Sequence, residues 1–320
     1  MIYSETAKVL IIDDFHPIFS ESLSIAGIEH TYNPDFDLNV ESELLKKYPI
    51  IALRSKMQMD QATIESLPKL KCIARGGAGM DNIDEAFALS KDITLLNAPE
   101  GNRDAVAEHC IGLLLTMSNN IHKSANELKT LQWNRESNRG WEIGGKTIGI
   151  IGYGNTGSSF AHKLSSFGCT ILAYDKYIKA TDAGLVEFVG LENLLQRSDV
   201  ISFHIPLNNE TKNLLNRELI SKMKDQVVLI NSSRGGICKT EDVWHGIESG
   251  KIKSFASDVF EQENMDKLNE EQKELLLKMS ASNQVVLTPH IAGWSTESYK
   301  KIAQVLAQKI IEYTTKVKNI

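Results

Sequence analysis

Short apolar runs alternate with longer helix-compatible stretches along the whole of this 320-residue chain. The runs are rich in Val, Ile and Leu, which is typical of strands buried on both faces of a parallel sheet. They are residues 9–12, 50–53, 70–74, 93–96, 148–151, 171–174, 200–203, 227–230, 254–257 and 285–287. The alternation predicts parallel sheets covered by helices, which is the α/β class.

A glycine-rich turn follows the run that ends at Ile151. Its sequence is Gly152-Tyr-Gly154-Asn-Thr-Gly157, and a helix-compatible stretch begins at Ser158. A strand, a tight turn and a helix N-terminus in this order present backbone N–H groups and the positive end of the helix dipole to a pyrophosphate. A flexible connection is the plainer interpretation of three glycines, but the order of the elements favours a dinucleotide site.

The next apolar run leads to Asp175, close to where a dinucleotide-binding unit has the acid that binds the adenosine ribose hydroxyls. A carboxylate there would repel the 2′-phosphate of NADP, and the following residues, Lys176 and Tyr177, provide only one cation. The sequence therefore predicts NAD rather than NADP as the cofactor.

The glycine-rich turn lies too far along the chain for a single sheet, because four apolar runs precede it. Residues 97–102 contain Pro and Gly and interrupt the pattern ahead of a predicted helix over 105–119, and a second junction follows His290. A final amphipathic helix over 296–313, capped by Ser295, is expected to return to the first domain.

We therefore predict two domains. Residues 1–98 and 291–320 are expected to form a smaller, flavodoxin-like α/β domain that binds the substrate. Residues 99–290 are expected to form a doubly wound, parallel-sheet Rossmann domain that binds NAD.

Composition and charge exclude several classes of protein. A net charge of -6 argues against a nucleic acid or an anionic membrane as the main partner. No apolar run approaches the ~20 residues of a membrane span, and the N-terminus lacks the pattern of a signal peptide. The cysteines are far apart and form no metal-binding cluster, so we expect buried thiols in a cytoplasmic protein without a metal; they are Cys72, Cys110, Cys169 and Cys238.

Three residues that suit hydride-transfer chemistry follow the ends of later runs: Arg234, Glu263 and His290. Ligands of an open parallel sheet bind outside the carboxyl ends of its strands, so these side chains could converge there. Oxidation of an alcohol carbon needs a base for the hydroxyl proton, and histidine takes and returns a proton near neutral pH. Glu263 would fix the histidine tautomer, while Arg234 offers a planar fork for a carboxylate.

Each of the three also has a plainer interpretation. A histidine after Thr-Pro can be a polar loop residue, Arg234 can pair with a surface acid, and Glu263 lies in a segment that contains many acids. Their common position downstream of a dinucleotide turn favours the catalytic interpretation.

These motifs resemble the D-isomer-specific 2-hydroxyacid dehydrogenase family over essentially the whole chain, and most closely its short-form D-3-phosphoglycerate dehydrogenases. The resemblance is carried by the glycine turn, by Asp258 with Glu263, and by residues 75–84, 99–102, 106–109, 231–236 and 288–293. Asn264 departs from the family pattern, which usually has proline after the glutamate.

The resemblance implies a role for individual residues. His290 would be the acid/base, Glu263 its partner, and Arg234 the clamp on the substrate carboxylate and carbonyl. The implied cofactor contacts are Gly152, Gly154, Asn155, Thr156 and Gly157 at the pyrophosphate, Asp175 at the ribose, His204 and Pro206 on the adenosine side, Asp258 at the nicotinamide carboxamide, and Ser232, Ser233 and Gly293. The implied substrate contacts are Arg54, Arg75, Gly77, Ala78, Asn102 and Arg135.

By this resemblance the protein is an NAD-dependent oxidoreductase that interconverts a D-2-hydroxyacid and its 2-oxoacid. Arg54, Arg75 and Arg135 supply charge for a phosphate, which favours D-3-phosphoglycerate and its oxidation to 3-phosphohydroxypyruvate in serine biosynthesis. Arg75 and Arg135 can equally be surface arginines, and a glyoxylate/hydroxypyruvate reductase or D-lactate dehydrogenase remains an alternative. An NADH-sensing, corepressor-like binding protein is the alternative of another class. The resemblance also implies a homodimer.

Overall fold

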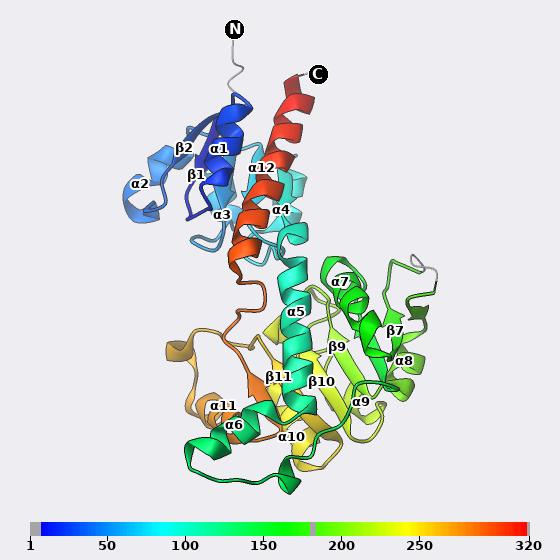
Figure 1. Ribbon diagram of the computed structural model, residues 1–320. Helices are drawn as coiled ribbons and strands as arrows, with labels where there is room; N and C mark the ends of the chain where they lie inside the picture. Colours follow the sequence, from blue (N-terminus) through cyan, green and yellow to red (C-terminus); the bar gives the residue numbers. More distant parts are fainter. Residues whose placement is uncertain (1–7, 180–183, 319–320) are drawn as a thin grey trace. The chain divides into compact units, whose positions relative to one another are not determined.

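Two parallel sheets, each covered by helices, make up the computed structural model of the chain (Figure 1). It describes residues 8–179 and 184–318. The chain divides into unit 1, Met1–Asn102 with Trp294–Ile320, and unit 2, Arg103–Gly293. The predicted α/β class is confirmed. The limits of the two units lie a few residues beyond the predicted domain boundaries.

Unit 1 is built on five parallel strands in the order β2-β1-β3-β4-β5. The strands are β1 (Lys8–Ile11), β2 (Glu29–Tyr32), β3 (Ile50–Leu53), β4 (Cys72–Arg75) and β5 (Thr94–Asn97). β1, β3 and β4 are almost entirely buried, which explains why their sequences are continuous apolar runs. This strand order is flavodoxin-like, and ligands of such sheets bind at the carboxyl ends of the strands.

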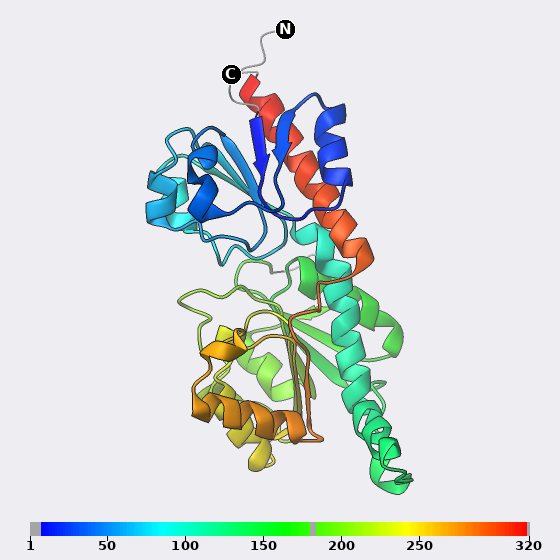
Figure 2. The same cartoon turned by 90° about the vertical axis from the view of Figure 1, so that its left-hand side faces the viewer.

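Helices cover both faces of the unit 1 sheet. One face packs against α2 (Leu38–Leu45), α3 (Gln61–Glu65) and α4 (Glu85–Ser90), and the other against α1 (Ile18–Ile25) and α12 (Thr296–Lys318). Figure 2 shows α1 and α12, from opposite ends of the sequence, side by side. The predicted cap of α12 is confirmed, because the Ser298 N–H donates to Ser295 Oγ at 3.0 Å.

Unit 2 is built on seven parallel strands in the order β12-β11-β10-β9-β6-β7-β8. They are β6 (Thr147–Ile151), β7 (Thr170–Tyr174), β8 (Glu187–Phe188), β9 (Val200–Phe203), β10 (Val227–Asn231), β11 (Ile252–Ser257) and β12 (Val285–Leu287). The chain moves outward from β6 to β8 and then returns to the other side of β6. The direction in which successive strands are added to the sheet therefore switches between β6 and β9, and doubly wound sheets bind dinucleotides at such a switch point.

Two apolar cores lie on the two faces of the unit 2 sheet. One contains residues of α5 (Pro99–Ser118) and α7 (Asn155–Leu164). The other contains residues of α8 (Leu191–Arg197), α9 (Arg217–Ser221), α10 (Thr240–Glu248) and α11 (Glu270–Ala281). The remaining elements are α6 (Ile121–Lys129) and the 3-10 turns η2 (Glu136–Asn138), η3 (Ser165–Phe167), η4 (Gly235–Ile237) and η5 (Met265–Lys267).

The prediction of the long helix was wrong at its start. α5 begins at Pro99 rather than near residue 105, because proline is well suited to the first turn of a helix. Gly101 does not end the pattern either. A Cβ at Gly101 would lie 2.6 Å from the backbone of Ile302, so glycine there permits close packing against α12. The apolar pattern also missed β2 and β8, which are polar strands at the sheet edges.

Three of the cysteines are buried, Cys169 is half-buried, and all four are free thiols. Across residues 8–179 and 184–318, no group of side chains is arranged to hold a metal ion. Within the same ranges, no helix combines the length and the apolar character that a membrane span needs.

Candidate functional site

The glycine-rich turn connects β6 to α7, as predicted. Gly152 has a φ of +94°, and Gly154 is the N-cap residue of α7. A Cβ at Gly157 would lie 2.0 Å from the Gly152 carbonyl oxygen, so only glycine lets the helix start this close to the strand. The first N–H groups of a helix have no partner within the helix. In α7 these N–H groups include those of Asn155 and Thr156, which are half-buried.

The turn has room for a pyrophosphate on its outer side. Gly154 is exposed, and a Cβ there would meet no atom within 4 Å. The Gly154 φ of -77° is one that any residue adopts, so backbone conformation does not require a glycine. An open cradle in front of helix N–H groups fits the diphosphate of NAD.

Asp175 directly follows β7 and is tied to the same turn. Its carboxylate accepts the Tyr153 N–H at 2.8 Å, the Tyr177 N–H at 2.8 Å and the Ile178 N–H at 3.0 Å. Partial burial raises the pKa of Asp175, but these backbone hydrogen bonds outweigh it, and the pKa lies below its ordinary value. The acid is therefore a fixed negative charge beside the turn, and its predicted role in selecting NAD stays a prediction.

His204 and Ser233 have structural contacts in this region. The His204 ring is buried, its Nε2 lies 2.8 Å from Ser202 Oγ, and its Nδ1 has no partner. Burial lowers the pKa of His204 to about 3, so the ring is neutral. Ser233 Oγ donates to the Phe203 carbonyl at 2.6 Å and accepts the Ile205 N–H at 3.2 Å. Ser233 thus connects the loops after β9 and β10. The predicted cofactor contacts of His204 and Ser233 stay predictions.

His290 and Glu263 lie together after the ends of β12 and β11, which are neighbouring strands. His290 Nδ1 is 2.8 Å from Glu263 Oε2, and both side chains are about half exposed. The other ring nitrogen, Nε2, is therefore left to exchange a proton with a ligand. The bond to Glu263 fixes which nitrogen that is.

The hydrogen bond that His290 donates to Glu263 raises the pKa of His290 above its ordinary value, although burial and the charge of Arg234 oppose the rise. Partial burial raises the pKa of Glu263, but the bond to His290 and its charge outweigh this, and the net shift is downward. The raised pKa of His290 and the lowered pKa of Glu263 are the shifts expected when an ionised carboxylate stabilises an imidazolium.

Arg234 follows β10, and its Nη1 donates to the Ser233 carbonyl at 2.6 Å. The next residue explains how this loop lies against the one that leads to Glu263. A Cβ at Gly235 would lie 1.8 Å from the carbonyl carbon of Phe260. Glycine at 235 therefore lets the two loops touch, and the three predicted catalytic residues all follow adjacent strands at one edge of the sheet.

Asp258 is fully buried, and its carboxylate contacts the loop that carries His290. It accepts the Thr288 hydroxyl at 2.5 Å, the Ile291 N–H at 2.9 Å and the Ala292 N–H at 2.7 Å. The predicted contact of Asp258 with the nicotinamide carboxamide stays a prediction, whereas its hold on this loop is a feature of the fold.

Most of the predicted substrate contacts of unit 1 lie at the carboxyl ends of β3 and β4, which are adjacent strands. The Arg54 guanidinium lies over the ring of Trp294, 4.6 Å from the centroid, and 5.7 Å from that of Tyr299. Its backbone N–H donates to Asp13 Oδ2 at 2.6 Å. This cation–π contact orients the guanidinium on a tryptophan that is itself 66% exposed.

The backbone of the loop after β4 has a conformation that requires glycine. Gly77 has a φ of +149°, its carbonyl accepts the Ala98 N–H, and the Ala78 carbonyl accepts Asn97 Nδ2 at 2.8 Å. Arg75 folds along this loop, since a Cβ at Gly77 would lie 1.8 Å from Arg75 Nη1. Asn102, in the first turn of α5, has a buried Oδ1 without a partner.

The remaining predicted site residues are Arg135, Pro206, Ser232 and Gly293. Arg135 is exposed and precedes η2, Pro206 is exposed in the loop after β9, and Ser232 Oγ lies 3.0 Å from Cys110 Sγ. Gly293 is the last residue of unit 2. Their predicted roles are neither supported nor opposed by these contacts.

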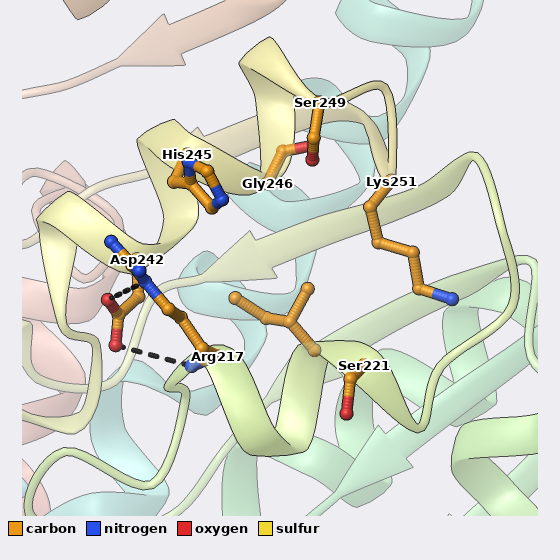
Figure 3. A pocket seen from close by; sticks show the side chains of 8 residues that line it. Arg217, Ser221, Asp242, His245, Gly246, Ser249 and Lys251 are labelled. Carbon is orange, nitrogen blue, oxygen red and sulfur yellow. Dashed lines mark hydrogen bonds and ion pairs between the residues drawn. The ribbon is translucent and has the colours of Figure 1, made fainter.

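A hollow of about 330 Å³ on unit 2 is lined by none of the predicted site residues, and Figure 3 shows the side chains that line it. It is lined by α9, α10 and Lys251, which precedes β11, and Arg217 is paired there with Asp242 at 2.9 Å. Because Lys251 is at the amino end of its strand, this hollow belongs to the opposite edge of the sheet from His290.

Sequence reasoning missed two groups that the structure brings to these sites. His109 on α5 lies 3.1 Å from Thr288 Oγ1, and Trp294 supports Arg54. His109 follows no strand end in the apolar pattern, whereas Trp294 lies in the loop after residues 285–287. The signal available for Trp294 was a large aromatic residue directly after the His290 motif, and for His109 it was a polar residue on the apolar face of a helix.

Comparisons with known proteins place this geometry in context. A family model described as "D-isomer specific 2-hydroxyacid dehydrogenase, NAD binding domain" matches residues 111–292. The chain is 37% identical over 275 residues to a hydroxypyruvate reductase of Thermotoga maritima, which covers 85% of this chain and 88% of that protein. It is 33% identical over 305 residues to a D-3-phosphoglycerate dehydrogenase of Archaeoglobus fulgidus, which covers 92% of this chain and 56% of that protein.

The chain thus spans little more than half the length of that dehydrogenase. Among solved structures, the D-lactate dehydrogenase of Aquifex aeolicus in complex with NAD and lactic acid is similar with a TM-score of 0.83 at 27% identity. The similarity covers 98% of this chain and 96% of that one.

Proposed function

This chain belongs to the D-isomer specific 2-hydroxyacid dehydrogenase family, whose members are NAD-dependent enzymes, and we propose that its substrate is D-3-phosphoglycerate. The reaction would give 3-phosphohydroxypyruvate, a step of serine biosynthesis. The observation that carries the chemistry is the 2.8 Å contact between His290 and Glu263 in the unit that contains the dinucleotide turn.

Bound NAD would supply the hydride acceptor. His290 Nε2 takes the proton of the substrate hydroxyl and, in reduction, returns it to the carbonyl oxygen. Glu263 holds the ring through Nδ1 and stabilises the imidazolium that forms. The Arg234 guanidinium binds the substrate carboxylate and polarises the carbonyl. Gly152, Gly154 and Gly157 shape the turn for the diphosphate, with Asp175 at the ribose.

The choice of a phosphorylated substrate is supported by the cations of unit 1. Arg54 is held on Trp294 at the carboxyl end of β3, and Arg75 is the last residue of the adjacent strand β4. A dianionic phosphate needs such fixed positive charge, whereas hydroxypyruvate, glyoxylate and pyruvate do not. The similarity to a hydroxypyruvate reductase keeps that unphosphorylated oxoacid as the second candidate.

A substrate panel tests the proposal. The purified protein is assayed for NADH oxidation with 3-phosphohydroxypyruvate, hydroxypyruvate, glyoxylate and pyruvate. We expect the highest kcat/KM for the phosphorylated oxoacid. Arg54→Gln should lower kcat/KM for it more than for hydroxypyruvate, whereas Lys91→Gln, an exposed cation elsewhere in unit 1, should change neither.

Three outcomes would contradict parts of the proposal. A preference for hydroxypyruvate that Arg54→Gln leaves unchanged would exclude the phosphate assignment. Absence of turnover with every oxoacid, while NADH still binds, would exclude the enzyme and favour an NADH-sensing binding protein. Turnover that survives His290→Ala would exclude the acid/base assignment.

We also propose that the protein is a homodimer. No residue of α6 is buried in the single chain, and apolar side chains follow it, with Leu131 94% and Trp133 83% exposed. A second copy of the chain would cover them. Light scattering should give the mass of two chains, and a monomer at the concentrations used in the assay would exclude this proposal.

A further inference from the structure

A chain of hydrogen bonds runs behind the loop that carries His290. His109 Nε2 lies 3.1 Å from Thr288 Oγ1, and that hydroxyl lies 2.5 Å from Asp258 Oδ1. His109 Nε2 is also 3.6 Å from the same carboxylate oxygen. All these residues belong to unit 2, and Asp258 is fully buried.

The direction of these bonds follows from the donors available. Each Asp258 oxygen accepts a backbone N–H, as a carboxylate does, so the Thr288 hydroxyl directs its single proton to Asp258. The hydroxyl oxygen then has only lone pairs to offer to His109. His109 must therefore carry a proton on Nε2 and donate it.

The loop held by this chain has an unusual backbone. His290 has a φ of +55°, in the left-handed region that residues other than glycine rarely adopt. Such a conformation persists only where surrounding contacts impose it. Here the His290 N–H donates to the Asp258 carbonyl at 2.8 Å, while the Asp258 carboxylate holds the next two N–H groups.

We propose that His109 is a positioning residue for the proton transfer at His290. Its Nε2–H orients the Thr288 hydroxyl toward Asp258, and Asp258 holds residues 288–292 in the conformation that directs His290 at Glu263. Without the donor, the hydroxyl is free to turn away, and a fully buried carboxylate loses a hydrogen bond. The inference rests on the acid/base role proposed for His290.

The main test compares two substitutions of the same side chain. His109→Phe keeps a ring on α5 but removes the donor, and we expect kcat to fall about 100-fold, as a catalytic group displaced by an ångström does. The Kd for NADH should change much less than kcat, because the hydrogen bond of His109 goes to Thr288 and not to the glycine turn. His109→Gln places an amide N–H near the position of Nε2 and should restore most of kcat.

The pH profile separates a positioning effect from general destabilisation. Glu263, Arg234 and Asp258 are the charged groups that act on His290. When His290 is poorly aligned with Glu263, the limb of kcat/KM that reports His290 should move to lower pH in His109→Phe. The matched control is His245→Phe, an exposed histidine on α10, which should leave kcat and the profile unchanged.

Two kinetic results would overturn the inference. One is a folded His109→Phe variant with wild-type kcat and pH profile. The other is a His109→Gln variant that loses as much activity as His109→Phe, since the donor would then not be what matters.

A measurement on the unaltered protein decides the matter even if the variants do not fold. In ¹⁵N-labelled protein, the imidazole nitrogens of His109 should show a proton on Nε2, and an unprotonated Nε2 would overturn the inference. Failure of the wild-type enzyme to reduce any oxoacid would refute the proposed function instead, and would leave this tautomer result unaffected.

Discussion

The two glycines at the start of α7 should respond in opposite ways to an added methyl group. In Gly157→Ala, the new Cβ would lie 2.0 Å from the Gly152 carbonyl oxygen, so strand and helix must separate by roughly 1 Å to relieve the overlap. Overpacking of this kind costs about 1–3 kcal/mol. In Gly154→Ala, the new Cβ meets nothing within 4 Å, so the change in the free energy of unfolding should stay within about 0.5 kcal/mol.

For NADH binding, Gly154→Ala should have the more selective effect. Because Gly154 faces the space assigned to the pyrophosphate, a methyl group there should raise the Kd for NADH at least tenfold, or about 1.4 kcal/mol, without loss of stability. Gly157→Ala should weaken both stability and binding, since the whole turn is displaced. Urea unfolding gives the first quantity, and quenching of tryptophan fluorescence by NADH gives the second.

Either of two results would refute these expectations. If Gly154→Ala binds NADH as tightly as the wild type, the diphosphate does not approach this turn, and the fit of the cofactor argued from the open cradle is wrong. A large loss of stability in Gly154→Ala would instead show that the space in front of α7 is filled by protein.

Three further predictions follow from other contacts. Asp175→Ser removes the charge beside the turn, so the ratio of kcat/KM with NADH to that with NADPH should fall about tenfold or more, and an unchanged ratio would exclude Asp175 as the discriminating acid. Glu263→Gln removes the group that raises the pKa of His290, so reductive activity, which needs the protonated ring, should be lost at lower pH than in the wild type; the same limb in both enzymes would contradict the pairing. In the wild type, the interaction of His290 with Glu263 contributes to the free energy of unfolding. The contribution of His290 is fully present below the pKa of an unfolded histidine, ~6.5, and is lost as the pH rises through the raised pKa of His290. The contribution of Glu263 is lost as the pH falls through its lowered pKa. Gly112→Ala, in the middle of α5 with nothing within 4 Å of the new Cβ, should stabilise the protein by about 0.5–1 kcal/mol in urea unfolding, and a lower midpoint would show that this helix face is in contact with another chain.

Much of the fold could be predicted from the sequence because its central strands are buried on both faces. Residues 50–53 and 200–203 are entirely buried, so they had to be continuous apolar runs, and a helix between such runs implies a parallel sheet. The edge strands β2 and β8 escaped prediction for the same reason, since a strand with one partner needs no apolar run.

The candidate site, too, could be predicted only in part from the sequence. Arg234, Glu263 and His290 could be predicted as candidates because the topology of a parallel sheet brings every strand's carboxyl end to one edge. The topology alone does not predict that Asp258 fixes the backbone of the His290 loop. That role depends on burial, on the left-handed backbone of His290 and on a contact between His109 and Thr288, residues 179 positions apart in sequence.

The two acids after β11 show how environment assigns these tasks. Asp258 is fully buried and surrounded by a hydroxyl and backbone N–H groups, so its carboxylate fixes the backbone of the loop. Glu263 is about half exposed and has His290 as its main partner, so its carboxylate acts on the ring instead. The proton transfer proposed at His290 needs both acids, because a ring aligned only by its own hydrogen bond would turn away whenever that bond weakens. Removing either acid should therefore lower kcat, but only loss of Glu263 should leave the loop conformation of His290 intact.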